Sequence, residues 1–326
     1  MRKPGPTRRD VLRLMQDQTP VRLVPRVDLV NVLEYEQQAK RKLPAAAFAQ
    51  IADGARAEFD RITLHPRLIV PVMDMDLTAT LFGEAHFTPI LVGPISDQKR
   101  FHADAELAMI RGASAAKAAV VVSSQSSVPL ETLEAEAKTP LCYQVGVQEP
   151  AARARIDKAI KAGCKVVCVT MNPAPPAGWP AFAALKRGVG VPVIAKGVAT
   201  PAAATVALQN GADGIIVSTY GGSNKPAILT LASVVDAVEG KVPVLIDGSF
   251  RRGTDIVKAM AFGAQGVLVG RPVMWGLAAY GVDGVQGVME MLQTEFARYM
   301  GQCGRSTLKV VDRSMVRVHG QERARG

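Results

Sequence analysis

The stretch VPVLIDGSFRRGTDIVKAMAFGAQGVLVGRP (242–272) contains two short apolar runs on either side of a helical pattern. Both runs are rich in Val, Ile and Leu and show no alternation with polar residues, which indicates strands that are buried on both faces. The helical pattern between them, residues 253–264, closes at a glycine, as helices commonly do. The stretch therefore predicts two parallel strands joined by a helix.

The same unit recurs from residue 86 to residue 273. Alanine-rich helical patterns separate most of the apolar runs, which lie at 86–96, 119–125, 139–147, 164–172, 191–198, 214–222, 242–249 and 266–273. Eight successive units match a closed (β/α)8 barrel better than an open doubly wound sheet of fewer strands. We therefore predict an α/β protein built on one TIM barrel.

The predicted barrel spans residues 31–304, between a basic N-terminal tail (1–30) and a basic C-terminal tail (305–326). Helical patterns in the first 85 residues are expected to cover the N-terminal end of the barrel, and a long helix near 279–301 is expected to close it. The segment PAPPAGWPAFAALKRGVG (173–190) predicts a short loop 4, in a region where barrel enzymes often carry gating insertions.

Composition excludes several classes of protein. The chain has 326 residues, of which 48% are hydrophobic, and this content rules out intrinsic disorder. The net charge of +10 comes almost entirely from the two tails, and only 5% of residues are aromatic, so we expect no nucleic-acid partner. No apolar run reaches the roughly 20 residues that a membrane span needs.

The four cysteines and four histidines show no metal-binding spacing. We therefore expect no metal site, and we expect reduced thiols in a cytoplasmic protein. TRRDVLRLM (7–15) resembles a twin-arginine export signal, but the following QDQTPVRLVPR (16–26) lacks the apolar segment of such signals. Export remains the alternative to a cytoplasmic location.

Polar residues end the apolar runs, and the C-terminal ends of the strands are where the active sites of such barrels lie. One such residue would be uninformative, but a ring drawn from all eight runs indicates a bound ligand. The alternative is that these side chains only solvate the strand ends. The residues are Ser96, Gln98, Ser123, Gln144, Thr170, Lys196, Ser218, Tyr220, Asp247 and Arg271.

The last two runs predict an anion site. Arg251 and Arg252 precede a predicted helix, and Arg271 directly follows the eighth run. Guanidinium groups beside a glycine-rich turn and a helix N-terminus bind anions, and barrels of this kind hold phosphate at this place. Asp247 suits the hydroxyl groups of a ribityl or sugar chain, and Arg252 fits a role in solubility better than the other two arginines.

Lys196 ends the run VPVIAKGV (191–198). A buried lysine is unfavourable unless it is paired, so a functional reason is expected. It is either a nucleophile that forms a Schiff base or a cation that stabilises an anion. The second reading fits a cofactor that lies across the mouth of the barrel.

Several segments resemble the FMN-dependent L-2-hydroxy-acid oxidases and dehydrogenases, a family that includes glycolate oxidase, lactate oxidase, mandelate dehydrogenase and the flavin domain of flavocytochrome b2. The resemblance covers about residues 30–310 and implies a flavoprotein oxidoreductase with FMN at the barrel mouth. It also implies a small-molecule substrate and a homo-oligomer, for which a tetramer is one candidate. The segments are NVLEYEQQAKRKLP (31–44), GPISDQKRFHADAE (93–106), SSQSS (123–127), IAKGVAT (194–200), GADGIIVSTYGG (211–222), residues 247–272 and EFARYMGQCG (295–304).

The resemblance also implies which residues contact FMN, and each of these positions keeps a compatible residue type. They are Pro94, Ser123, Gln144, Thr170, Lys196, Ser218, Asp247, Arg251, Gly270 and Arg271.

The substrate side departs from the family's pattern. The family's catalytic His lies in a Ser-Asn-His-Gly-x-x-Arg-like stretch whose Arg binds the substrate carboxylate, and here Tyr220 and Ser223 take these two places. Two family tyrosines fall on Gln50 and Gly146, and the Asp that pairs with the catalytic base falls on Asn172. The loop that supplies a second Arg is shortened. We therefore predict Tyr220 and Lys196 as the catalytic residues.

Three hypotheses follow from these departures. The first is a divergent FMN enzyme in which Tyr220 donates a proton or a hydrogen bond to a less acidic, bulkier or more apolar substrate. The second is an FMN-binding protein without hydroxy-acid oxidase activity, a pseudoenzyme or partner subunit. The third is a non-redox flavin barrel, such as the type 2 isopentenyl-diphosphate isomerases. Lys225 and Arg100 are candidates for a replacement cation.

Overall fold

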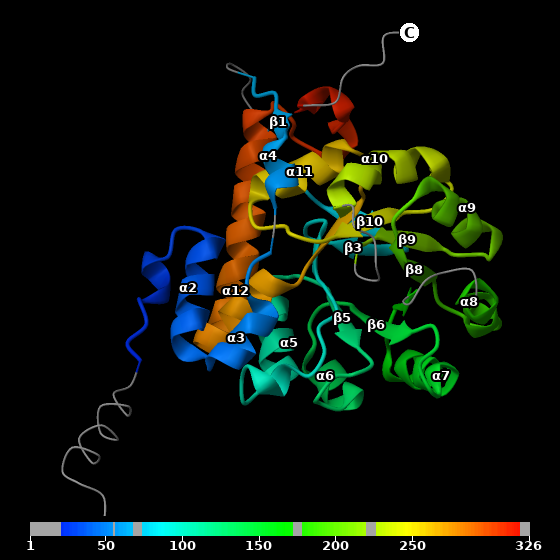
Figure 1. The fold of residues 1–326 in the computed structure, drawn as a ribbon, viewed down its shortest axis with the longest axis horizontal. Coiled ribbons are helices and arrows are strands. Elements are labelled where there is room, and N and C mark those ends of the chain that lie inside the picture. Colours follow the sequence, from blue (N-terminus) through cyan, green and yellow to red (C-terminus); the bar gives the residue numbers. More distant parts are fainter. Residues whose placement is uncertain (1–20, 55, 68–73, 172–177, 220–225, 320–326) are drawn as a thin grey trace, which may run out of the picture.

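A closed barrel of eight parallel strands forms the centre of the computed structural model, which describes residues 21–54, 56–67, 74–171, 178–219 and 226–319 (Figure 1). The barrel closes where the last strand pairs with the first. Each of the eight barrel strands lies inside one of the predicted apolar runs, so the predicted TIM barrel is confirmed. The strands are β4 (Ile90–Val92), β5 (Val120–Ser123), β6 (Leu141–Gly146), β7 (Val166–Thr170), β8 (Val193–Val198), β9 (Gly214–Val217), β10 (Val244–Asp247) and β11 (Gly266–Val269).

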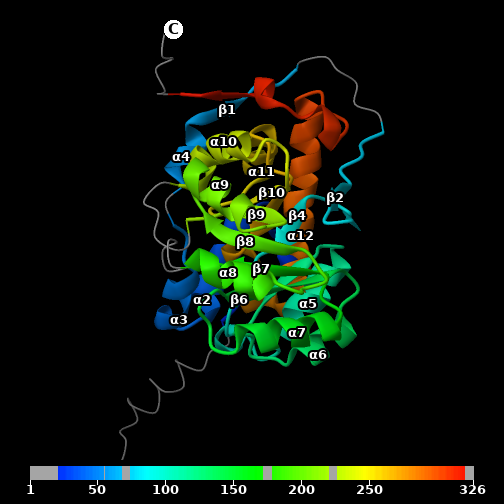
Figure 2. The same cartoon turned by 90° about the vertical axis from the view of Figure 1, so that its right-hand side faces the viewer.

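Helices alternate with the strands and surround the barrel (Figures 1 and 2). Local signals explain several of their ends: the Thr200 side chain accepts a hydrogen bond from the Ala203 amide at the start of α9, and Gly163 ends α7 with a φ of 110°. The helices are α5 (Ala105–Ala115), α6 (Leu130–Glu136), α7 (Ala152–Ala162), α8 (Gly178–Lys186), α9 (Pro201–Gln209), α10 (Ala227–Val238), α11 (Gly253–Ala261) and α12 (Arg271–Gln302).

The closing helix α12 begins eight residues earlier than the predicted 279–301. Pro272 stands in its first turn, where a proline is tolerated because the amide there has no partner inside the helix. Gly281 has a φ of 61° and kinks the helix instead of ending it. The extension places Arg271 at the mouth of the barrel.

The N-terminal segments do not all cover the end of the barrel where we expected them. Its N-terminal end receives the hairpin of β2 (Ala79–Leu81) and β3 (Glu84–His86), whose Leu81 packs with the barrel interior. In contrast, α2 (Val32–Lys42) packs along α12, as Figure 1 shows. The end of α3 (Ala45–Ile51) reaches the opposite, C-terminal end, where Trp275 donates a hydrogen bond to Ile51 O at 2.7 Å.

Part of the predicted C-terminal tail is folded. β12 (Val316–Val318) pairs antiparallel with β1 (Ile62–Leu64), and both lie at the top of Figure 2. Two short 3-10 helices, η4 (Leu308–Val310) and η5 (Arg313–Met315), precede it, and α4 (Ala57–Asp60) lies just before β1. The pairing ties the end of the chain to the segment that follows the N-terminal helices.

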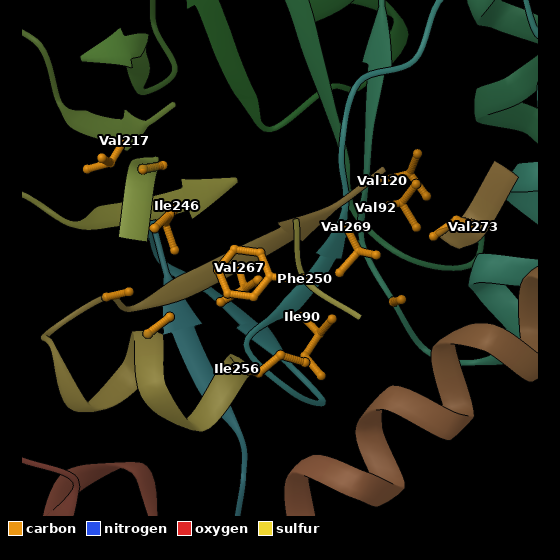
Figure 3. Close-up of a cluster of buried hydrophobic side chains, with 14 of the residues drawn as sticks. Ile90, Val92, Val120, Val217, Ile246, Phe250, Ile256, Val267, Val269 and Val273 are labelled. Carbon is orange, nitrogen blue, oxygen red and sulfur yellow. The ribbon is translucent and has the colours of Figure 1, made fainter. Parts of the chain in front are cut away.

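Two apolar layers hold the barrel together. One lies between the strands and the surrounding helices; Figure 3 shows part of it, with Phe250, Ile246, Ile256 and Val267 in one cluster. The other fills the barrel interior, as packed barrel cores do. Burial raises the pKa of the Cys168 thiol in this interior to about 12, so the thiol stays neutral. The interior side chains include Leu91, Val121, Cys142, Cys168, Ile194, Ile216, Leu245 and Leu268.

None of the helices in the described part of the chain combines the length and the apolar character that crossing a membrane requires.

The kink in α12 makes a stability prediction. A Cβ added at Gly284 would clash with the carbonyl oxygen of Gly276 on the other side of the kink. Gly284→Ala should therefore lower the free energy of unfolding by about 1–3 kcal/mol in urea denaturation. Gly190 has open space around it and provides the control, since Gly190→Ala should change stability by less than about 0.5 kcal/mol. Equal stability of the two variants would contradict this packing.

Candidate functional site

A layer of polar groups closes the C-terminal end of the barrel interior. Side chains alternate along a strand, so the next inward-facing position lies two residues beyond each interior apolar residue. Lys196, for example, follows Ile194, and Asp247 follows Leu245. The change from apolar to polar or glycine occurs on all eight strands, at Gly93, Ser123, Gln144, Thr170, Lys196, Ser218, Asp247 and Gly270.

This layer forms the floor of a cavity of about 540 Å³, within the range of about 300–1,000 Å³ that is usual for ligand sites. Gln125, Thr219, Ser249 and Phe250 line it without having been predicted. Ten residues of the predicted ring and cofactor set line it: Pro94, Ser96, Ser123, Gln144, Thr170, Lys196, Asp247, Arg251, Gly270 and Arg271.

Two of the predicted residues, Ser218 and Gln98, do not line the cavity. Ser218 is 1% exposed and accepts a hydrogen bond from Lys196 Nζ at 2.9 Å. Gln98 is also buried, and its side-chain amide donates to Ile95 O at 3.3 Å. Ser218 thus belongs to the site through Lys196, whereas Gln98 braces the loop after β4.

Lys196 is the buried cation of the site, with 4% of its surface exposed. Its ammonium group forms an ion pair with Asp247 Oδ2 and donates to the Ser218 hydroxyl. Asp247, which the sequence assigned to hydroxyl groups, is therefore first of all the counter-ion of Lys196. These two contacts favour the role of a charge over that of a nucleophile.

The neutral polar side chains of the layer are held in fixed orientations. Gln144 Nε2 donates to Thr170 Oγ1 at 3.0 Å, and Ser123 Oγ accepts from the Gln125 amide at 3.2 Å. Donors and acceptors that are already oriented lose little entropy when a ligand binds.

Two arginines stand at one end of the cavity. Arg251 is 2% exposed, and its guanidinium lies 4.9 Å from the centre of the Trp275 ring. Its Nε and Nη2 donate to Asp53 Oδ1 at 3.0 and 2.6 Å. Burial lowers the pKa of Arg251, and Asp53 opposes this shift. Arg271 Nη1 donates to Ala52 O at 3.3 Å, so both arginines contact the segment that follows α3.

The N-terminus of α11, which the sequence analysis included in the anion site, is already satisfied by carboxylates. The amides of Arg251 and Arg252 donate to Asp255 Oδ2 at 2.9 and 3.0 Å, and the Gly253 amide donates to Glu295 Oε2 at 2.7 Å. The Arg252 guanidinium also pairs with Glu295, at 2.9 Å. Arg252 therefore has a structural role at the start of α11, and not only the role in solubility that the sequence analysis favoured.

The N-terminus of α12 is the helix end that faces the cavity. Its N-cap residue, Gly270, has no side chain, and a Cβ added there would meet nothing within 4 Å. The open space lies beside Arg271, so an anion could approach both the guanidinium and the positive N-terminal end of the helical segment that precedes the kink at Gly281.

Several residues of the predicted substrate side lie outside the described residues: Asn172, Tyr220, Ser223 and Lys225. Gln50 is exposed on α3, where its amide donates to Ala46 O, and it does not line the cavity. Arg100 forms an ion pair with Asp97 at 2.7 Å.

Glu149 is a residue that sequence reasoning missed. Its Oε2 accepts hydrogen bonds from Ser124 Oγ at 2.7 Å and from the Gly146 amide at 3.0 Å, and its Oε1 lies 3.3 Å from Arg155 Nη1. A Cβ added at Gly146 would lie 3.6 Å from this carboxylate. The carboxylate thus stands beside the space that a larger side chain at position 146 would enter. No sequence motif marks it.

The fold and the site define a class of protein: a (β/α)8 barrel with a polar cavity at its mouth that is lined by one lysine and two arginines. Comparison with known proteins names the family. The model of the FMN-dependent dehydrogenases matches residues 39–177 and 173–318. This chain therefore belongs to the FMN-dependent dehydrogenase family.

Relatives of known activity and structure agree with this assignment. Glycolate oxidase of Spinacia oleracea is 32% identical over 89% of this chain and 96% of its own length, and L-lactate oxidase of Nostoc is 32% identical over 88% and 98%. Among solved structures, a variant mandelate oxidase with 2-hydroxy-phenylacetamide superimposes with a TM-score of 0.83 at 30% identity, covering 89% of this chain and 99% of that one.

The residues present fit FMN, the cofactor that the family implies. A buried cation at the floor, oriented hydrogen-bonding groups along the wall and two guanidinium groups at one end match an isoalloxazine ring, a ribityl chain and a phosphate. The open space at Gly270 provides the close backbone approach that a phosphate needs.

The pairing of Lys196 with Asp247 makes a prediction about stability. Asp247→Asn leaves the ammonium group buried without its counter-ion and should lower the free energy of unfolding by about 3 kcal/mol. Lys196→Met should be milder, because the Asp247 side chain is 21% exposed and stays partly hydrated. The double variant should be more stable than Asp247→Asn alone. Denaturation of the four proteins gives the coupling, and additive losses would rule out the ion pair as a stabilising contact.

Proposed function

We propose that this chain is an FMN-binding oxidoreductase with an altered active site, in which Tyr220 takes the place of the family's catalytic His and the substrate is uncharged. The observation that carries the proposal is the lining of the cavity at the barrel mouth, which combines the buried Lys196 with the two arginines, Arg251 and Arg271. This lining supports a cofactor site like that of the family, whereas the residues of the substrate side differ from the family's pattern.

The proposed cofactor contacts follow the geometry of the cavity. Lys196 would place its positive charge against the isoalloxazine ring, while Gln144 and Thr170 would hydrogen bond to its polar edge. Asp247 would bind ribityl hydroxyls, and Arg271 would bind the phosphate. FMN, when bound, supplies the acceptor for two electrons from a substrate carbon.

Tyr220 would act through the proton that its phenol holds. A phenol has an ordinary pKa near 10, so roughly one part in a thousand is ionised at neutral pH, whereas an imidazole is largely available as a base. If the phenol replaced the imidazole as the base, its deprotonation at neutral pH would therefore cost about 4 kcal/mol from the difference in pKa alone. We infer that Tyr220 donates a hydrogen bond to the substrate oxygen, and that the proton lost by the oxidised hydroxyl group passes to water.

Among the residues that the structure describes, the pairing of two arginines supports an uncharged substrate. Arg100 and Arg155 have carboxylate partners, at 2.7 Å from Asp97 and 3.3 Å from Glu149. A Cβ at Gly146 would lie 3.6 Å from Glu149 Oε2, so a larger side chain there would contact this carboxylate. A substrate carboxylate would need a cation that is not already paired, and charge-assisted contacts of this kind contribute about 1.5–3 kcal/mol each.

A pair of substrates with the same shape tests this proposal. L-Mandelate and 2-hydroxy-phenylacetamide differ in that the amide carries no charge. Mixed anaerobically with the FMN-loaded protein, the amide should bleach the flavin absorbance at least tenfold faster than the acid, a difference of about 1.4 kcal/mol. Faster reduction by the acid would contradict an uncharged substrate. If neither reduces the flavin, and photoreduced protein is inert towards oxygen and quinones, the chain binds FMN without turnover.

Tyr220→Phe tests the role of the phenol. The variant keeps the ring and loses the hydroxyl, so the rate of flavin reduction by 2-hydroxy-phenylacetamide should fall by about 10²–10⁴-fold, while the dissociation constant for FMN stays the same. Stopped-flow absorbance and a flavin titration measure the two quantities. An unchanged reduction rate would remove Tyr220 from the mechanism.

A further inference from the structure

Asp53 occupies the donors of an arginine that the cofactor phosphate would use. Arg251 Nε and Nη2 both donate to Asp53 Oδ1, and its Nη1 donates to Phe250 O at 2.8 Å. Every nitrogen of this guanidinium therefore has an acceptor from the chain. A phosphate at this end of the cavity would have to share Arg251 with a carboxylate or displace it.

A contact with α2 and one with the next residue hold Asp53 in place. Its amide donates to Glu36 Oε1 at 2.6 Å, and the Gly54 amide donates to its Oδ1 at 2.8 Å. The Asp53 side chain is 23% exposed, whereas that of Arg251 is 2% exposed, so the carboxylate is the partner with room to move. A Cβ on Gly54 would lie only 2.6 Å from Arg271 Nη1, so the segment also lies against the second arginine.

The local charges are nearly balanced. Burial is the largest cause of the lowered pKa of Arg251. The positive charges of Arg271 and Arg56 lie close enough to lower it further. Asp53 pairs with Arg251, and Asp255 pairs with Arg56 at 2.8 Å. Because Asp255 is the partner of Arg56, Asp53 alone cancels half of the charge that Arg251 and Arg271 would together offer to a phosphate.

We infer that Asp53 is an internal competitor of the cofactor phosphate and sets how strongly the site prefers FMN to riboflavin, which has no phosphate. This inference rests on the proposed FMN site and adds a residue that determines its specificity. The carboxylate lies within hydrogen-bonding distance of Arg251 and next to Arg271, where its repulsion of a phosphate is strongest. A ligand without a phosphate would not experience that repulsion.

Asp53→Asn tests the inference because it removes the charge and keeps an acceptor for Arg251. We expect the dissociation constant of FMN to fall about tenfold while that of riboflavin changes by less than twofold, both measured by flavin fluorescence titration. Inorganic phosphate, as a probe without a flavin ring, should raise the melting temperature of the variant more than that of the wild-type protein.

A purely structural role of Asp53 would give a different result. If Asp53 only anchors its segment, the variant loses affinity for both flavins by the same factor. Glu36→Gln is the matched control, since it also removes one charge and loosens the same segment without touching Arg251. It should leave the ratio of the two dissociation constants unchanged.

The outcomes separate this inference from the proposed function. Flavin binding with the same FMN-to-riboflavin ratio in wild type and Asp53→Asn overturns the role of Asp53 and leaves the FMN site standing. Weaker FMN binding in the variant, or an equal change of ratio in Glu36→Gln, also overturns it. If neither protein binds a flavin or responds to phosphate, the proposed function and the inference both fail.

Discussion

In a closed barrel, every second side chain of every strand must point into one shared interior. Eight strands meet this constraint with an apolar residue in one layer and a polar residue or glycine in the next layer towards the C-terminal end. One step of two residues along each strand therefore separates the core from the site. The position of this change from apolar to polar residues along the strands determines where the cavity, the buried Lys196 and the end of the cavity with Arg251 and Arg271 lie.

Burial of charge is the second constraint on the site. Lys196 and Arg251 are each almost completely buried, and each has a carboxylate partner, Asp247 and Asp53 respectively. Such pairs avoid the penalty of an unpaired buried charge. In both pairs the cation has a carboxylate partner, which a ligand would have to share or displace.

The fold could be predicted from the sequence because buried parallel strands leave continuous apolar runs, and all eight runs contain the observed strands. About half of the cavity residues could also be found, since most of them lie at the ends of those runs. Asp53 could not, because it lies 198 residues from Arg251 in the chain. The acceptors at the start of α11 were missed for a related reason: Glu295 comes from a different helix, and no local pattern announces a contact between helices.

The central claim is that this barrel mouth holds FMN. It is tested most directly by the flavin content of the purified protein, measured from its visible absorption spectrum and by chromatography of the cofactor released on denaturation. The account predicts FMN in a ratio approaching one per chain, either as purified or after incubation with FMN and removal of the excess. A colourless protein that takes up no FMN under these conditions would contradict it.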